Sequence, residues 1–232
     1  RVVAALREEC PEITSIVQNV NTRRTNAILG KQNRTLWGTG VMHDKLLGCT
    51  FEIGPSSFYQ TNPAQTEVLY QLALEAAGFE SGMSVLDAYC GTGTIGICAA
   101  AANSGVEVTG VERVASAVRC AERNARANEV NERCGFVAAD ATEWMSHKAG
   151  EKHFDVVLMD PPRAGSTPEF LHGVADLAPE RVVYVSCNVQ TQARDLEVLL
   201  GRDYRLQSVA PVDMFPHTKH VECVASLRRT RR

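Results

Sequence analysis

The sequence predicts an α/β fold with a mostly parallel sheet, and three observations lead to this class. Beyond residue 60, short apolar runs alternate with longer segments of helical spacing, which is typical of a parallel sheet with helices on both faces. A glycine-rich segment follows the first apolar run, and acidic residues follow several of the others. Because open α/β sheets bind ligands beyond the carboxyl ends of their strands, we expect the functional groups to lie there.

Residues 1–59 are expected to form part of a small β-rich domain. Its β-prone runs are separated by turn-forming residues such as Gly30-Lys31 and Met42-His43-Asp44, a pattern typical of antiparallel strands. The expected strands are residues 13–20, 26–29, 34–41 and 49–53. The chain opens without an initiator methionine, so we expect it to be a fragment of a longer protein.

Residues 60–232 are expected to form the domain that carries the parallel sheet. Pro63 suits the first turn of the opening helix, and Gly78 suits its end. The expected helices are residues 63–77, 95–102, 115–128, 141–146, 168–177 and 190–200. The expected strands are residues 84–86, 107–111, 135–138, 154–159, 182–185, 205–212 and 221–227. No helix separates the last two strands, so we expect them to form an antiparallel edge at the C-terminal end of the sheet.

Composition disfavours several classes of protein. The apolar content of 44% is ordinary for a globular chain, and no apolar stretch is long enough to span a membrane. The eight cysteines form no Cys-x-x-Cys pair, so we expect no metal site, no disulfide framework and a reduced, cytoplasmic setting. The net charge of −3 gives no indication of a nucleic-acid binder, although basic residues outnumber acidic ones in the first fifty positions.

The glycine-rich segment leaves two classes of cofactor open. Gly91, Gly93 and Gly96 have the G-x-G-x-x-G spacing, and Glu112 ends the next strand at a distance suited to a ribose. This pattern alone favours a nicotinamide cofactor. Asp87, however, ends the strand before the glycines, where a carboxylate repels a pyrophosphate and attracts an ammonium or sulfonium group.

Two further acidic residues favour a cationic cofactor. Asp140 ends the third strand, where it suits the amino group of an adenine. Asp160 ends the fourth strand and is followed by Pro161-Pro162-Arg163, which forms a rigid turn at the ligand edge. Each acid taken singly could be a helix cap or a solvated group. Four carboxylates at successive strand ends together suit S-adenosylmethionine.

Cys187 follows the apolar run 181–185 and is the candidate nucleophile. A thiol just beyond the carboxyl end of a buried strand lies where ligand chemistry gathers. Glu222, thirty-five residues later, is the candidate partner base. Most free cysteines are small buried hydrophobic residues, so Cys187 alone does not decide between the two roles.

Five motifs, in this order along the chain, resemble those of the RNA uracil-5-methyltransferases. These are class I, S-adenosylmethionine-dependent enzymes that make 5-methyluridine in ribosomal or transfer RNA. The resemblance runs from about residue 13 to the end of the chain. The motifs are Ser57-Phe58-Tyr59-Gln60-Thr61-Asn62-Pro63, Leu86-Asp87-Ala88-Tyr89-Cys90-Gly91-Thr92-Gly93, Asp160-Pro161-Pro162-Arg163, Val185-Ser186-Cys187-Asn188 and His220-Val221-Glu222.

The resemblance implies a domain arrangement and partners. Residues 60–232 would be the catalytic domain with a Rossmann-like sheet, and residues 1–59 the C-terminal part of a β-rich central RNA-binding domain. The substrate would be RNA, with ribosomal RNA expected in preference to transfer RNA, and the protein a monomer with no membrane partner. Some members hold an iron–sulfur cluster in a domain that would precede this chain; Cys10 and Cys49 do not show its spacing.

The resemblance also implies roles for particular residues. Cys187 matches the family's nucleophile and Glu222 its general base. Thr94 departs from the asparagine of some relatives, although its hydroxyl can still form a hydrogen bond. Cofactor-binding positions are Gln60, Tyr89, Gly91, Thr94, Glu112, Asp140 and Asp160. Substrate-binding positions are Phe58, Gln60, Asp160 and Arg163.

These residues suit methylation at carbon 5 of uracil. A thiolate added at carbon 6 makes carbon 5 nucleophilic, and a base must later remove the carbon-5 proton. His217 and His220 could supply that base by residue type, but histidines beside a site are more often structural. Phe58 or Tyr59 could stack on a uracil that has left its RNA stack, whereas one of them could instead fill the domain junction.

Three other functions stay open at this point. An amino-group methyltransferase typically has an aromatic residue where Arg163 stands and needs no cysteine after the fifth strand. A nicotinamide dehydrogenase fits the glycine spacing but has no use for Cys187 and Glu222. A non-catalytic RNA-binding fragment is disfavoured by the complete set of reactive residues.

Overall fold

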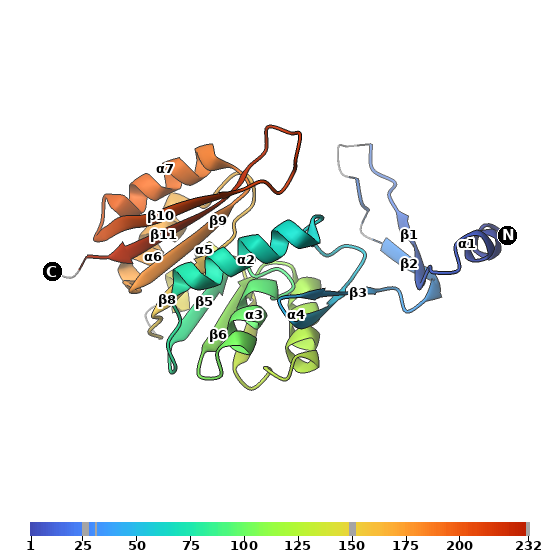
Figure 1. Ribbon diagram of the computed structural model, residues 1–232, viewed down its shortest axis with the longest axis horizontal. Helices are drawn as coiled ribbons and strands as arrows, with labels where there is room; N and C mark the ends of the chain where they lie inside the picture. The colour runs from blue at the N-terminus through green and yellow to red at the C-terminus, as the bar shows by residue number, and fades with distance from the viewer. Residues whose placement is uncertain (25–27, 31, 149–151, 231–232) are drawn as a thin grey trace.

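The computed structural model describes residues 1–24, 28–30, 32–148 and 152–230. Its centre is a seven-stranded sheet (Figure 1) in which β11 is antiparallel to both neighbours and the other adjacent pairs are parallel. The order across the sheet is β10 (Tyr204–Val212), β11 (Glu222–Arg229), β9 (Arg181–Ser186), β8 (Val156–Met159), β5 (Ser84–Ala88), β6 (Glu107–Glu112) and β7 (Cys134–Ala138). The predicted fold class and the antiparallel C-terminal edge are confirmed. The reversed strand, β11, lies one position in from that edge.

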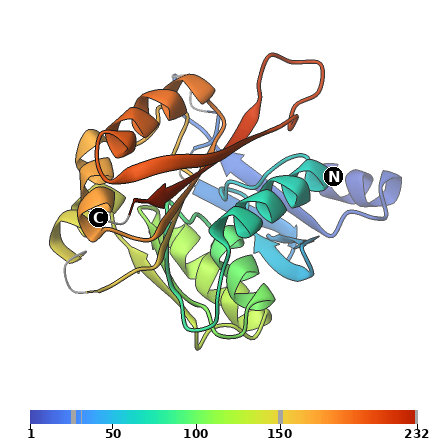
Figure 2. The same ribbon diagram turned by 60° about the vertical axis from the view of Figure 1, so that its left-hand side comes forward.

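Helices cover both faces of the sheet (Figures 1 and 2). One face packs against α2 (Pro63–Ala77), α3 (Thr94–Ala102) and α4 (Ala115–Ala127), and the other against α5 (Ala141–Lys148), α6 (Pro168–Leu177) and α7 (Val189–Leu200). Side chains alternate along each strand, so that Val156 and Leu158 join one core and Val157 and Met159 the other. This two-sided burial explains why the strands are continuous apolar runs.

The N-terminal elements form two separate hairpins. A helix, α1 (Val2–Glu9), precedes the antiparallel pair β1 (Ser15–Val20) and β2 (Gln32–Gly38), which extends away from the main sheet (Figure 1). The second pair is β3 (Met42–Leu46) and β4 (Cys49–Ile53). Of the strand expected at 26–29, residues 26 and 27 lie outside the described residues, and Ile28 and Leu29 lie in a bend. The expectation of a strand is therefore wrong for residues 28 and 29.

Two expectations for this region are wrong. The segment Met42-His43-Asp44 was expected as a turn and instead opens β3. The turn lies at Leu47 and Gly48, whose φ values of 49° and 80° match a two-residue hairpin turn of the type that twists with its strands. The helix α1 was not expected; it buries none of its residues.

The second hairpin packs on α4 through two asparagine side chains. The Asn124 amide accepts a hydrogen bond from the Glu52 backbone N–H (2.8 Å) and donates to the Glu52 carbonyl (3.4 Å). Asn128 does the same with the backbone of Thr50, at 2.8 Å for each bond. These amides pair with the outer edge of β4 as a neighbouring strand would. Asn124 also donates to the carbonyl of Thr92 (3.2 Å), and so ties the hairpin to the glycine-rich loop.

The hairpin shares its core with the sheet. Leu46, Phe51 and Ile53 are buried in the same cluster as Leu69 of α2 and Ile97 of α3. Strands β3 and β4 thus pack on the domain expected at residues 60–232. The division of the chain between residues 59 and 60 stays a prediction. Within the described residues, none of the helices combines the length and apolar character that crossing a membrane requires.

The Asn124 contacts predict a stability effect. Replacing Asn124, which is fully buried, with leucine leaves the N–H and C=O of Glu52 and the carbonyl of Thr92 without this partner. Each buried polar group left unpaired costs about 1–3 kcal/mol, so N124L should lower the free energy of unfolding by at least about 2 kcal/mol in urea titrations. The control is N131L, because Asn131 is exposed and bonds only the neighbouring Glu132 side chain. Equal unfolding midpoints for the two variants would contradict this account of the hairpin.

Candidate active site

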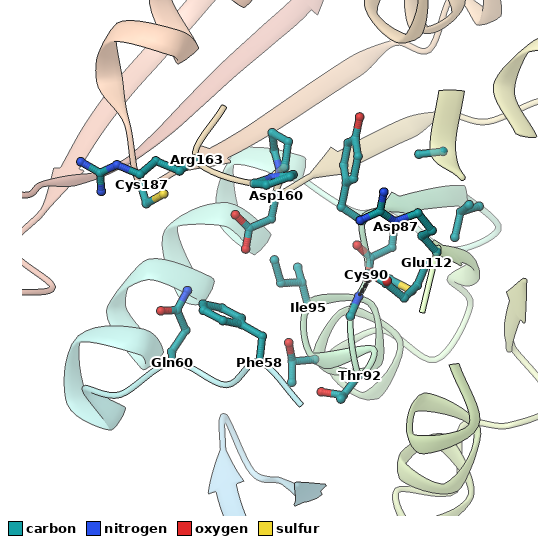
Figure 3. Close-up of a pocket in the computed structure, with 18 of the residues that line it drawn as sticks. Phe58, Gln60, Asp87, Cys90, Thr92, Ile95, Glu112, Asp160, Arg163 and Cys187 are labelled. Carbon is teal, nitrogen blue, oxygen red and sulfur yellow. Dashed lines mark hydrogen bonds between the residues drawn. The ribbon is translucent and has the colours of Figure 1, made fainter. Parts of the chain in front are cut away.

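A cavity of about 620 Å³ opens at the carboxyl edge of the parallel strands. The residues to which the family resemblance assigned catalytic or binding roles all line it: Phe58, Gln60, Tyr89, Gly91, Thr94, Glu112, Asp140, Asp160, Arg163, Cys187 and Glu222. In Figure 3, Cys187 and Arg163 lie toward one side, Asp87, Cys90 and Glu112 lie toward the other, and Asp160 lies between them. The lining thus has a thiol end and an acidic end, joined by Asp160.

Asp87 is buried at the end of β5 and faces the start of α3. Its Oδ2 accepts a hydrogen bond from the backbone N–H of Gly96 (3.0 Å). Burial raises the pKa of Asp87 to about 7; the bond from Gly96 opposes this shift, and the charge of Glu112 adds to it. Near neutral pH the carboxyl is therefore only partly ionised.

Glu112 and Asp140 end β6 and the segment after β7, and both bind backbone N–H groups at helix starts. Glu112 accepts from Gly91 (3.2 Å) and from Val114 (2.7 Å), which precedes α4. Asp140 accepts through Oδ1 from Thr142 (2.9 Å) and Glu143 (3.3 Å), in the first turn of α5. The bonds of Asp140 are the capping role that an acid at such a position can have, whereas those of Glu112 reach backbone that precedes its helix. They also fix each carboxylate at the cavity wall.

Asp160 differs from the other acids because its carboxylate makes no hydrogen bond to another described residue. Its carboxylate points into the middle of the cavity in Figure 3. Burial, followed by the nearby charges of Glu222 and Asp87, raises the pKa of Asp160 to about 8. This carboxyl group is therefore left for a ligand, and it is mainly protonated at neutral pH while the cavity is empty of cations.

The thiol of Cys187 and the carboxylate of Glu222 meet because β11 runs backward. Cys187 follows the last residue of β9, and Glu222 is the first residue of β11. The antiparallel register pairs Cys223 with Ser186, which brings the end of one strand beside the start of the other. Two residues far apart in the sequence thereby reach the same edge of the sheet.

The electrostatic environment of Cys187 opposes its ionisation. Burial raises the pKa of the thiol, and the charges of Glu222 and Asp160 raise it further, whereas the Arg163 guanidinium lowers it. Burial also raises the pKa of Glu222, with Arg163 again opposing the shift. Arg163 is thus the cationic side chain whose charge favours the ionised form of both groups.

The two histidines considered as bases take no part in the cavity lining. His220 contacts Arg163 instead, with 3.2 Å between its Nδ1 and the Arg163 Nη2. His217 is exposed, in the loop between β10 and β11, and has a positive φ of 65°. Their positions favour Glu222 as the base.

The two aromatic residues before α2 both line the cavity and differ in their exposure. Tyr59 is half-buried, and its ring also packs against the core. Phe58 is 76% exposed, and Figure 3 shows it near Gln60. Gln60 is buried, and its amide makes no hydrogen bond to another described residue. Phe58 is thus the more exposed of the two rings.

Three contacts that the sequence did not reveal support the cofactor positions. Thr94 shares a hydrogen bond of 2.9 Å with the hydroxyl of Tyr70, a buried residue of α2. Tyr89 has a left-handed backbone (φ 63°), which costs a non-glycine residue about 1–3 kcal/mol. Its ring packs on Phe170 with 5.2 Å between centroids, and its hydroxyl accepts from Ser166 (3.2 Å). A periodic pattern cannot reveal such contacts, because the partners lie on different elements.

The cavity suits a cationic, adenosine-containing ligand. Carboxylates line it at both ends, and desolvation keeps two of them from ionising fully. A bound cation would favour the ionised carboxylates, since opposite charges attract strongly in a cavity of low dielectric constant. Among the described residues, no cluster of side chains has the composition of a metal site.

The fold is similar to that of solved methyltransferases of α/β type. A precorrin-6y C5,15-methyltransferase of Geobacter metallireducens shares the fold alone, with a TM-score of 0.62, 14% identity and coverage of 75% of this chain and 94% of that one. The tRNA (uracil-54, C5)-methyltransferase of Pyrococcus abyssi, in complex with S-adenosyl-L-homocysteine, is more similar. Its TM-score is 0.81 at 35% identity, and the match covers 95% of this chain and 52% of that one.

Sequence comparison defines the family. The model described as tRNA (Uracil-5-)-methyltransferase matches residues 41–230, and the chain belongs to that family. An uncharacterized RNA methyltransferase of Oceanobacillus iheyensis is 44% identical over 228 residues, which make up 98% of this chain and 49% of the relative. One of Caldanaerobacter subterraneus is 44% identical over 230 residues, with 98% and 50% covered. The chain spans about half the length of these relatives.

Asp87 predicts how stability changes with pH. Its ordinary pKa is 3.8, against about 7 in the folded protein. Between these values the unfolded chain has released the proton and the folded chain has kept it, so the free energy of unfolding falls as pH rises. D87N cannot ionise and should be the more stable protein at pH 8 by a few kcal/mol, at about 1.4 kcal/mol per pKa unit, but not at pH 4.

Urea unfolding at the two pH values measures this difference. The exposed Asp213 gives the control variant D213N, which should follow the wild type at both pH values. A D87N protein that loses as much stability as the wild type between pH 4 and pH 8 would show that Asp87 ionises normally.

The charges around Cys187 predict opposite effects of two substitutions. R163Q removes the charge that lowers the Cys187 pKa, so alkylation of the thiol should need a higher pH. E222Q removes a charge that raises the Cys187 pKa, so alkylation should proceed at a lower pH. The measurement is the rate of iodoacetamide labelling of the Cys187 peptide against pH. R113Q, next to Glu112 at the other end of the cavity, serves as control. Shifts in the same direction for R163Q and E222Q would contradict the electrostatic account.

Proposed function

We propose that this chain is the catalytic part of an enzyme that methylates carbon 5 of a uridine in RNA and gives 5-methyluridine. The observation that carries the proposal is the meeting of Cys187 and Glu222 at one end of a cavity whose other end is lined by acids. Residues 60–232 would be the catalytic domain and residues 1–59 part of an RNA-binding domain, with β3 and β4 packed on the former.

S-adenosylmethionine is the proposed cofactor and supplies an electrophilic methyl group when bound. The residues proposed to hold it are Gln60, Tyr89, Gly91, Thr94, Glu112, Asp140 and Asp160. Glu112 suits the ribose hydroxyls and Asp140 the adenine amino group, because both carboxylates keep acceptor capacity beyond their bonds to backbone N–H groups. Asp87 and Asp160 supply negative charge near the cationic part.

The proposed chemistry begins with Cys187. Its thiolate adds to carbon 6 of the uracil, and the electrons of the carbon 5–carbon 6 double bond move so that carbon 5 becomes nucleophilic. Once carbon 5 carries the methyl group, it still holds its proton. Glu222 accepts that proton, the released electron pair restores the double bond, and the bond between carbon 6 and sulfur breaks to return the Cys187 thiolate.

The other side chains at this end position the base. Phe58 offers an exposed ring on which a uracil that has left its stack can lie. Gln60 and Asp160 can hydrogen-bond the edge of the pyrimidine, since both reach the cavity free of other described partners. Arg163 lies at the same end as Cys187 and can bind a phosphate of the RNA. Flipping the base costs a few kcal/mol, least in single-stranded loops.

The proposal for the substrate has a general part, a uridine in RNA, and a more specific part, the kind of RNA. A uridine in RNA is supported by the family and by the site. Ribosomal RNA is the expected target, and transfer RNA is the second candidate because the Pyrococcus abyssi protein is a tRNA (uracil-54, C5)-methyltransferase. Transcripts of both kinds, each presented with radiolabelled S-adenosylmethionine, separate the two by which RNA gains the label.

The mechanism predicts a trapped adduct. Fluorine at carbon 5 replaces the proton that Glu222 removes, so RNA containing 5-fluorouridine should stay covalently attached, with the methyl group added. Intact-protein mass spectrometry should detect this adduct in the wild type and in C10A, and not in C187A. The variant E222Q should accumulate the same kind of adduct with ordinary uridine, because the proton then has no acceptor.

An adduct that persists in C187A would refute the role of Cys187. Absence of an adduct in all proteins is resolved by repeating the experiment with a full-length relative. If that protein forms the adduct, the RNA needs the part of the family that this chain does not span; if it does not, the covalent mechanism is wrong.

A further inference from the structure

The proposed site places its functional groups on three different elements. Tyr89 follows β5, Asp160 and Arg163 lie in the loop after β8, and Cys187 follows β9. Catalysis by such a set requires that the elements keep their relative positions, because a displacement of about 1 Å can cost about a hundredfold in rate. A hydrogen-bond network centred on a buried residue of α7 connects all three.

Asp195 is the centre of this network. It is 1% exposed, in the middle of α7, and its carboxylate accepts hydrogen bonds on both oxygens. Oδ2 accepts from the backbone N–H of Ser166 and from the hydroxyl of Tyr184, each at 2.7 Å. Oδ1 accepts from Arg194, at 2.8 Å from Nε and 2.6 Å from Nη2. One carboxylate therefore joins the loop after β8 to strand β9.

The connection extends to the cofactor side through Ser166. Its backbone N–H bonds Asp195, and its hydroxyl donates to the hydroxyl of Tyr89 (3.2 Å). Tyr89 has the strained backbone described above and needs contacts that hold it. Ser166 therefore links the carboxylate on α7 to Tyr89, a proposed cofactor contact.

The same face of α7 holds the rest of the loop. Asn188 Nδ2 and Thr191 Oγ1 both donate to the carbonyl of Arg163, at 3.2 and 3.3 Å. Arg194 Nη2 donates to the carbonyl of Ala164 (3.0 Å). Positions 188, 191 and 195 lie on one face of a helix because they are three and four residues apart.

Gly165 allows the close approach on which this network depends. Its φ is 81°, and a Cβ placed there would lie 2.5 Å from Asp195 Oδ2 and 2.5 Å from Arg194 Nη2. Any side chain at residue 165 would push the loop away from α7. The glycine and the buried aspartate are therefore two parts of one packing arrangement.

We propose that Asp195 is a positioning residue, which fixes the loop carrying Asp160 and Arg163 against the strand carrying Cys187 and, through Ser166, holds Tyr89 in place. The proposal rests on the proposed function for the roles of those residues. Asp195 itself does not line the cavity. Its effect passes through the residues it holds.

The substitution D195N does not preserve the hydrogen bonds that Asp195 accepts. All of the partners are donors, whereas an asparagine side chain has one acceptor oxygen and an amide that donates. Whichever way the amide turns, it places a donor against Arg194 or against Ser166 and Tyr184. The hydrogen bond from at least one of these partners is therefore lost, while the side chain keeps its size.

The test compares D195N with D176N. Asp176 also accepts from an arginine at 2.6 Å, the Nη2 of Arg202, but it is exposed and leads to no cavity residue. In D195N, S-adenosylhomocysteine should bind about tenfold or more weakly by calorimetry, and the pH profile of Cys187 alkylation should change. D176N should match the wild type in both. Measurements are made at a temperature where circular dichroism shows each variant to be folded.

A second variant separates the connection to Tyr89 from the connection between the loop and β9. S166A keeps the backbone N–H that bonds Asp195 and removes only the hydroxyl that reaches Tyr89. It should weaken S-adenosylhomocysteine binding about fivefold, as expected for about 1 kcal/mol, and leave Cys187 alkylation unchanged. A purely structural role would lower the melting temperature of D195N and leave ligand affinity and thiol reactivity of the folded protein at wild-type values. That result would overturn the proposal.

The two readouts use no RNA. A wild-type protein that binds S-adenosylhomocysteine but methylates no uridine would count against the proposed function, while the comparison of D195N with the wild type would keep its meaning. Failure of the positioning proposal and failure of the proposed function are therefore distinguishable.

Discussion

The convergence of carboxylates at one edge of the sheet is the constraint on which the rest of the site depends. Parallel strands end at the same edge, so an acid at the end of each strand adds charge to the same small volume. Burial makes that charge costly, and the pKa values of Asp87 and Asp160 rise in consequence. A cavity with this composition favours a positively charged occupant over a neutral or anionic one.

The negative charge of the cavity also opposes ionisation of the Cys187 thiol. Glu222 and Asp160 oppose ionisation of Cys187, and Arg163 opposes them only in part. Under the proposed function, a cationic cofactor near Asp160 would offset these carboxylates and favour the thiolate. Nucleophile activation would then follow cofactor binding, which limits the reactivity of the free protein toward other electrophiles. Three other acids of the cavity, Asp87, Glu112 and Asp140, are held in place by backbone N–H groups near the starts of α3, α4 and α5.

Most of the parallel sheet could be predicted from the sequence because its strands are buried on both faces and read as apolar runs between helices. The acids and the thiol of the cavity lining could be predicted for a related reason, since residues after such runs must meet at one edge, whereas Phe58 and Gln60 were expected only from the family resemblance. The N-terminal part was harder. The start of β3 is a polar, solvent-facing segment that resembles a turn, and α1 has no buried face to produce a periodic signal. Asp195 looks like a solvated helix residue until the position of Gly165 is known.

The reversed direction of β11 also constrains the order in which the site can form during synthesis. Strand β9 leaves the ribosome before β10, yet its neighbour in the finished sheet is β11, which is made after both. Until residues 222–229 emerge, β9 has an open edge beside Cys187, and β10 has no strand to pair with. The partial chain therefore has the thiol of Cys187 without the carboxylate of Glu222. Under the proposed function it would have the nucleophile without the base, so completion of the sheet and competence for turnover would coincide.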